Sequence, residues 1–203
     1  MKIIGLCGGS GSGKGTVCDI FRESGVPSID TDAVYRELTN TPSDCQRALA
    51  AEFGSEIITD EGTLNRRKLA DIVFSGEDSP KRLARLNEIA HKYILDETRR
   101  RLALYRENGL PLAIVDAPVL FESGFDAECD AVVCVIADRE IRTQRIMTRD
   151  SLSKEEAERR IDAQMSDAEL VSKCDYVIHN NSDLTALRHE VDKILHKLLV
   201  NNS

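Results

Sequence analysis

The segment Gly8–Thr16 (GGSGSGKGT) has the composition that points most directly to chemistry. It follows an apolar run, Ile3–Cys7, and leads into a helix-like stretch, Lys14–Glu23, which is the strand–loop–helix context of a phosphate-binding loop. Glycines let the backbone curl so that successive N–H groups point at phosphate oxygens, and the helix N-terminus adds partial positive charge. Lys14 can reach the β- and γ-phosphates of ATP. The sequence therefore predicts ATP binding by this segment, which we call the phosphate loop.

Two other interpretations of the phosphate loop fit less well. A flexible Gly/Ser turn would not need a lysine in register with both flanking elements, and no G-x-G-x-x-G fingerprint of a dinucleotide site can be placed here. The predicted ATP-binding residues of the loop are Gly11, Ser12, Gly13, Lys14, Gly15 and Thr16.

The residue after the lysine departs from the usual pattern. A Ser or Thr hydroxyl normally stands there and binds Mg²⁺, whereas this chain has Gly15 followed by Thr16. The G-K-G-T order is similar to that of adenylate kinases, and this similarity implies that magnesium is held largely through water and nucleotide. Thr16 is accordingly only a weak candidate metal ligand.

Carboxylates follow two further apolar runs. Val26–Asp32 ends in the acids Asp30 and Asp32, and Leu112–Val115 ends in Asp116. Ligands of open α/β sheets sit at the carboxyl ends of the strands, so these acids should face the site. Either of the first two acids could cap the following helix while the other takes a proton from an acceptor hydroxyl. Asp116 could hold a magnesium-bound water.

Short continuous apolar runs imply strands buried on both faces. The clearest are Ile3–Cys7, Leu112–Val115 and Ala131–Ile136, with a weaker pair at Val26–Ile29 and Tyr176–Ile178. Each precedes a helix-like segment, so the pattern predicts an α/β doubly wound fold with a five-stranded parallel sheet.

Two helical insertions interrupt this pattern. About eighty residues without a strand signal separate the second and third strands, too many for a plain crossover. We predict a nucleotide-binding core at about 1–31, 109–138 and 174–203, a helical acceptor lobe at about 32–108, and a helical lid at about 139–173, all in one domain. Mobile helical lobes suit a kinase, which must exclude water from the transferring phosphoryl group.

The composition limits the partners and the compartment. A formal net charge of −8 argues against a nucleic-acid or anionic-membrane binder. The N-terminus shows no signal-peptide pattern and no segment could span a bilayer, so we expect a cytoplasmic protein. The six cysteines form no C-x-x-C pair, which favours reduced, buried thiols over disulfides or a metal site.

Several motifs in order along the chain resemble those of the dephospho-coenzyme A kinase family. The phosphate loop alone would mark only a P-loop kinase, but the later motifs are far more specific. The matching residues and segments are Gly8–Thr16, Val26–Asp32 with its D-x-D, Phe53-Gly54, Gly62–Arg66, Leu86–Ile89, His91, Asp116–Glu122 with its P-x-L-F-E, Arg145, Arg149, Gln164, Asp175–Ile178 and Asn180.

The resemblance implies a P-loop kinase-like fold and a reaction. ATP would phosphorylate the ribose 3′-hydroxyl of dephospho-coenzyme A with Mg²⁺ as cofactor, in the last step of coenzyme A biosynthesis. The implied partners are ATP and dephospho-coenzyme A, with no nucleic acid and no membrane, in a monomer or weak homo-oligomer. The implied roles are these: Lys14 holds ATP phosphates, Asp32 is the general base, Arg66 and His91 help bind the acceptor, Arg145 and Arg149 neutralise charge on the transferring group from the lid, and Asn180 lies near the adenine.

The chain departs from the family pattern at three positions. Lys92 follows His91 where Pro is usual, Arg142 stands where Gln is common, and Gly15 replaces Ser. None of these changes removes a predicted catalytic group, but they weaken the metal assignment.

A stripe of arginines in the predicted lid has a plainer interpretation. Arg139, Arg142, Arg145 and Arg149 recur every three or four residues and could simply pair with nearby acids. Beside a phosphate loop, however, contact with phosphate is the favoured interpretation.

Two other functions remain alternatives. A nucleoside or nucleoside-monophosphate kinase would share the loop and the lid. A GTPase-like switch would need an N-K-x-D motif, where this chain has Asn180-Asn181-Ser182-Asp183.

Overall fold

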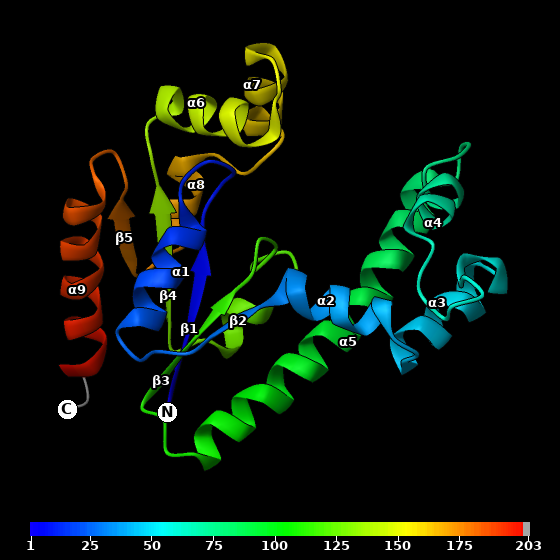
Figure 1. Ribbon diagram of the computed structural model, residues 1–203, viewed down its shortest axis with the longest axis horizontal. Coiled ribbons are helices and arrows are strands. Elements are labelled where there is room, and N and C mark those ends of the chain that lie inside the picture. The colour runs from blue at the N-terminus through cyan, green and yellow to red at the C-terminus, as the bar shows by residue number, and fades with distance from the viewer. Residues whose placement is uncertain (201–203) are drawn as a thin grey trace. The chain divides into compact units, whose positions relative to one another are not determined.

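The computed structural model describes residues 1–200, and within them five strands form one sheet in the order β2-β3-β1-β4-β5 (Figure 1). The β1–β3, β1–β4 and β4–β5 pairs are parallel. The strands are β1 (Lys2–Cys7), β2 (Ser28–Asp30), β3 (Leu112–Asp116), β4 (Ala131–Ile136) and β5 (Tyr176–His179).

The central strands are apolar because both faces of the sheet are covered. All five residues of β3 are buried, as are the last four of β1 and the middle four of β4. After β1, the chain adds β2 and β3 on one side of that strand, and then β4 and β5 on its other side. The strand order therefore reverses direction at β1. Ligands of open α/β sheets bind at this point, outside the carboxyl ends of the strands.

One unit of the chain comprises Met1–Ile29 and the chain from Leu104 onward. A cluster of buried side chains from the strands, α1 and α9 forms its main core. Figure 1 shows α6 and α7 beyond the arrowheads of β1 and β4, at the carboxyl edge of the sheet. The helices are α1 (Lys14–Glu23), η2 (Phe125–Glu128), α6 (Arg139–Asp150), α7 (Lys154–Asp162), α8 (Asp167–Ser172) and α9 (Leu184–Val200).

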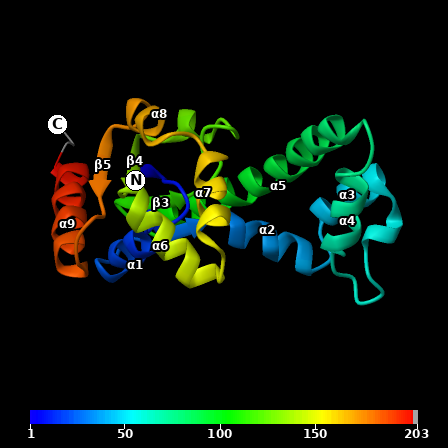
Figure 2. The same ribbon diagram turned by 90° about the horizontal axis from the view of Figure 1, so that it is seen from above.

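The second unit, Asp30–Ala103, is helical and has a core of its own. Side chains from α3, η1, α4 and α5 fill that core, among them Leu49, Ile57, Val73 and Ile89. Figure 2 shows α3 and α4 lying together near the start of α5. The helices are α2 (Thr31–Asn40), α3 (Asp44–Phe53), η1 (Ser55–Ile57), α4 (Arg66–Val73) and α5 (Ser79–Glu107), the last continuing beyond this unit.

The predicted α/β fold with a five-stranded parallel sheet is confirmed. The strand expected at Val26–Ile29 begins only at Ser28, since Pro27 has no N–H to donate to a ladder; its carbonyl nevertheless accepts from Ile114 N at 2.9 Å. The assignment of core, acceptor lobe and lid stays a prediction. Within residues 1–200, none of the helices combines the length and the apolar character needed to cross a membrane.

A pair of phenylalanines tests which side chains carry the stability. Phe21 is fully buried in the main core, whereas Phe74 is 62% exposed. We expect Phe21→Ala to lower the free energy of unfolding by about 3–5 kcal/mol because it leaves a cavity. Phe74→Ala should change it by no more than about 0.5 kcal/mol. Urea unfolding of both variants measures this, and equal losses would contradict the assignment of the core.

Candidate active site

The phosphate loop joins β1 to α1 through backbone that only glycine adopts easily. Gly11 and Gly13 have φ values of 78° and 90°. A Cβ on Gly11 would lie 2.6 Å from the carbonyl oxygen of Arg142, and one on Gly13 would lie 2.1 Å from Asn180 Nδ2. Both the conformation and the close packing therefore require glycine at these two positions.

Lys14 and Asp116 meet at the carboxyl edge of the sheet. Asp116 is paired with Leu6 in the β1–β3 register, which places it beside the end of β1. Lys14 Nζ donates to Asp116 Oδ1, and Cys18 Sγ lies 3.3 Å from the other carboxylate oxygen. Only 16% and 13% of the Lys14 and Asp116 side chains are exposed. A phosphate entering the loop would compete with Asp116 for the lysine.

Arg145 and Asn180 hold the turn of the loop from α6 and from the end of β5. Arg145 Nη1 donates to Gly11 O at 3.2 Å, and Arg145 Nη2 donates to Asn180 O at 3.1 Å. The buried Asn180 donates through Nδ2 to Ser12 O at 2.8 Å. The structure thus brings both predicted residues to the phosphate loop, although their roles toward ATP stay predictions.

The sequence analysis named Arg142 only as a member of the arginine stripe and gave it no role of its own in the site. Its side chain is 4% exposed, and its Nε donates to Ser10 O at 2.9 Å. Its Nη1 donates to Asp167 Oδ1 at 2.7 Å, while Gln164 Oε1 accepts from Ser10 N at 2.8 Å. Arg142 therefore links α6, α8 and the phosphate loop. The sequence feature that pointed to Arg142 was its spacing of three residues from Arg145. Spacing alone could not show that the Arg142 side chain is buried.

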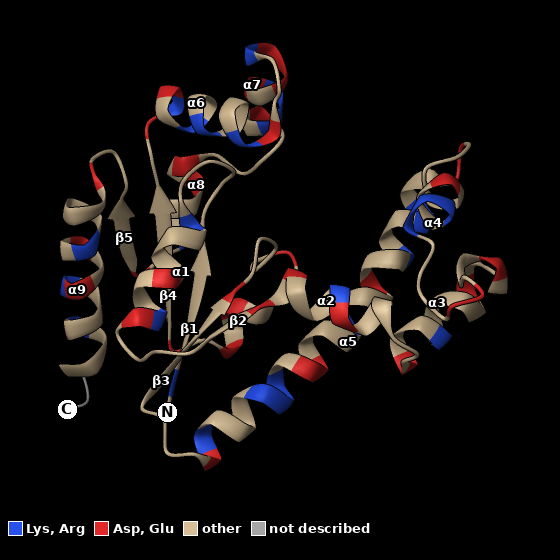
Figure 3. Ribbon diagram, in the orientation of Figure 1, with Lys and Arg blue, Asp and Glu red and all other residues tan. Residues whose placement is uncertain are grey.

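The other two arginines of the stripe pair with acids. Arg139 donates to both Asp162 oxygens at 2.6 and 3.0 Å, and Arg149 donates to both Asp150 oxygens at 2.8 Å. Hydrogen bonds from these arginines lower the pKa of each carboxyl below its usual range. The Arg149 side chain is 59% exposed, and its role in ATP binding stays a prediction. Figure 3 shows basic residues, in blue, recurring along α6.

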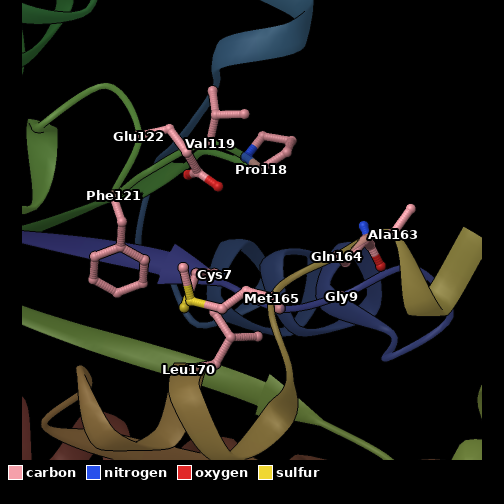
Figure 4. A pocket seen from close by; sticks show the side chains of 11 residues that line it. Cys7, Gly9, Pro118, Val119, Phe121, Glu122, Ala163, Gln164, Met165 and Leu170 are labelled. Carbon is pink, nitrogen blue, oxygen red and sulfur yellow. The ribbon is translucent and has the colours of Figure 1, made fainter.

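A pocket of about 240 Å³ adjoins the start of the phosphate loop (Figure 4). Its wall contains residues of the P-x-L-F-E segment, of the connection after α7 and of the end of β1. The sequence could not show that these three segments lie side by side. The lining residues are Cys7, Gly8, Gly9, Pro118, Val119, Phe121, Glu122, Ala163, Gln164, Met165 and Leu170.

In the helical unit, the structure decides which of the two neighbouring acids is a cap. Asp30 Oδ1 accepts from Asp32 N at 2.8 Å and from Ala33 N at 3.0 Å, so Asp30 is the N-cap of α2. Asp32 lies in the first turn of that helix with an exposed side chain. The Asp32 carboxylate is therefore not used for capping.

The two predicted acceptor-binding residues lie on other helices of the same unit. Arg66 begins α4 and donates to Thr39 Oγ1 at 3.0 Å and to Asn40 Oδ1 at 3.4 Å. Asp32 lies seven residues before Thr39 on α2, about 10 Å along the helix axis. His91 is half-buried in α5. Their acceptor contacts stay predictions.

The oxygen donors at the phosphate loop suit Mg²⁺, which prefers carboxylates, hydroxyls and phosphate oxygens. The Asp116 carboxylate ends β3, and the Thr16 hydroxyl is exposed in the first turn of α1. Ser12 Oγ is buried without a hydrogen-bond partner among residues 1–200, so it is available to a ligand of the loop.

A family model described as dephospho-CoA kinase matches residues 2–186. The chain belongs to the dephospho-CoA kinase family. A relative from Syntrophotalea carbinolica, named dephospho-CoA kinase, is 37% identical over 199 residues, covering 98% of this chain and 93% of its own length. One of the same name from Lactobacillus johnsonii is 33% identical over 195 residues, covering 96% of this chain and 97% of its own.

The fold agrees with this membership. The solved structure of a dephospho-CoA kinase from Campylobacter jejuni has a TM-score of 0.71 to this chain at 24% identity, covering 99% of this chain and 98% of its own. The predicted resemblance is confirmed, and the chain is a kinase. A nucleoside or nucleoside-monophosphate kinase is not favoured.

Two glycines of the phosphate loop test its packing by the same substitution. A Cβ on Gly15 meets nothing within 4 Å, and Gly15 lies inside α1. We expect Gly15→Ala to raise the free energy of unfolding by about 0.5–1 kcal/mol through helix propensity. Gly13→Ala should instead destabilise the protein and weaken ATP binding, because it strains φ and displaces Asn180. Thermal unfolding and calorimetric ATP titration measure both effects; equal behaviour of the two variants would contradict the packing described.

Proposed function

We propose that this chain transfers the γ-phosphoryl group of ATP to the ribose 3′-hydroxyl of dephospho-coenzyme A, giving coenzyme A and ADP. The observation that supports this most is the family match over residues 2–186, which includes both the phosphate loop and the helical unit that carries the predicted acceptor residues. The reaction is the last step of coenzyme A biosynthesis.

The phosphate loop serves the donor side of this reaction. Its backbone N–H groups and Lys14 bind the phosphates of ATP, and Lys14 exchanges Asp116 for a phosphate oxygen as ATP enters. Arg145, already hydrogen-bonded to Gly11 O, is placed to stabilise negative charge that develops on the transferring group. Arg149 would join it after release from Asp150.

Asp32 serves the acceptor side as general base. Its carboxylate takes the proton of the 3′-hydroxyl as the new O–P bond forms, while the bond from the γ-phosphorus to the bridging oxygen breaks and its electron pair leaves with ADP. Since Asp30 is the N-cap of α2, the Asp32 carboxylate is not needed for capping. Arg66 and His91 would bind the acceptor from α4 and α5.

Magnesium would be held by Asp116, mainly through water, with Thr16 as a weaker ligand, and it would neutralise phosphate charge. The segment 139–173 acts as a lid and residues 32–108 as the acceptor lobe. We further propose that the protein works in the cytoplasm, as a monomer or weak homo-oligomer, without nucleic-acid or membrane partners.

An acceptor panel tests the assigned reaction. With ATP as donor, kcat/KM for dephospho-coenzyme A should exceed those for AMP, CMP and adenosine by at least about 100-fold, since contacts made only by the correct acceptor lower its barrier selectively. A coupled ADP-release assay measures this, and replacing ATP with GTP tests the donor. Better turnover of a nucleotide acceptor would overturn the assignment, and a preference for GTP would favour a GTPase-like site.

Two neighbouring Asp→Asn substitutions test the base. Asp32→Asn should lower kcat by about 10²–10⁴-fold with little change in stability, because an amide cannot take the hydroxyl proton. Asp30→Asn is the matched control: Asn caps helices as well as Asp does, so both stability and activity should be nearly retained. Turnover of Asp32→Asn within a few-fold of the unsubstituted enzyme would exclude Asp32 as the base.

A further inference from the structure

Three cysteines far apart in the sequence meet beside the phosphate loop. Cys7 ends β1, Cys134 lies in β4, and Cys174 precedes β5. Their Sγ atoms all lie within 4.8 Å of one another, and Cys7 Sγ and Cys174 Sγ are 3.5 Å apart. The sequence analysis missed this cluster because the parallel pairing of Cys7 with Cys134, a tertiary feature, brings the thiols together.

The spacing of the three sulfurs suits one metal ion. A Zn–S bond of about 2.3 Å puts thiolates about 3.8 Å apart in a tetrahedral site and about 4.0 Å apart in a trigonal one. The observed Sγ separations, 3.5 Å for one pair and no more than 4.8 Å for the others, bracket those values. Small side-chain rotations would therefore complete the site without movement of the backbone.

The backbone around the cluster is well fixed. Cys7 and Cys134 are 2% and 0% exposed inside the sheet. Cys174 is half-buried, and Asp175, next to it, donates from N to Val132 O at 2.9 Å and accepts at Oδ2 from Val132 N at 2.8 Å. Metal ligands held on a rigid framework lose little conformational entropy on binding.

Metal binding at this position would also release protons. Sulfur binds a metal ion as thiolate, so a divalent ion held by all three cysteines displaces thiol protons, which are released to solvent.

We propose that Cys7, Cys134 and Cys174 form a binding site for one thiophilic metal ion, with Zn²⁺ as the probe. Soft thiolates select such ions over Mg²⁺, so the site is chemically distinct from the oxygen donors at Asp116 and Thr16. Of the three cysteines, Cys7 also lines the pocket beside the phosphate loop, together with Met165 (Figure 4). Three sulfur ligands leave a fourth position for water.

Metal titration of reduced, untagged enzyme tests the site. With excess Mg²⁺ present and no nucleotide, we expect one Zn²⁺ per chain by competition with a chromophoric chelator. Co²⁺ in its place should give sulfur-to-metal charge-transfer absorption in the near ultraviolet. Cys174→Ser should lower the Zn²⁺ affinity at least about tenfold and weaken that absorption, because one of the three sulfur ligands is lost. Cys174 is the least buried member of the cluster, so this variant is the one expected to fold normally.

Cys129→Ser is the matched control, since Cys129 is also half-buried but lies outside the cluster. It should bind Zn²⁺ as the unsubstituted enzyme does. Zn²⁺ should also raise the Tm of the unsubstituted enzyme and of Cys129→Ser, but not that of Cys174→Ser. Absence of sulfur-to-cobalt absorption, an unchanged Zn²⁺ affinity in Cys174→Ser, or an equal loss of affinity in Cys129→Ser would each overturn the proposal.

Discussion

The backbone of the phosphate loop is the constraint on which the rest of this structure depends. Between β1 and α1 the chain must turn with positive φ at Gly11 and Gly13. The space that a Cβ would fill is taken by the backbone of Arg142 and the side chain of Asn180. Loop and surroundings are therefore complementary in shape: α6 and the end of β5 can approach only because the loop has no side chains there.

Charge is distributed to match this arrangement. The chain carries a formal net charge of −8, yet Lys14, Arg142 and Arg145 converge on the loop from two helices. Their partners are Asp116, Asp167 and backbone carbonyls of the loop. Lys14 and Arg142, whose side chains are only 16% and 4% exposed, concentrate positive charge at the loop of an acidic protein, which agrees with membership of a kinase family.

In the helical unit, two acids separated by one residue have different structural roles. Asp30 accepts hydrogen bonds from two backbone N–H groups at the start of α2, whereas Asp32, two residues further along the chain, has an exposed side chain. An Asp at an N-cap satisfies orphan donors, whereas one in the first turn is favoured only by the helix dipole and keeps its oxygens for other partners. Capping therefore decides which carboxylate is available for proton transfer.

The local sequence was sufficient to locate the strands, apart from the start of β2, and the helical regions and the phosphate loop. Their signals are short-range: continuous apolar runs such as Ala131–Ile136, and glycines with a lysine at a strand–helix junction. Only the tertiary structure showed that Arg142 and Arg145 contact the loop while Arg139 and Arg149 pair with acids, since spacing alone cannot say what lies opposite a helix face. The same limit hid the cluster of Cys7, Cys134 and Cys174, because strand pairing across more than a hundred residues brings those sulfurs together.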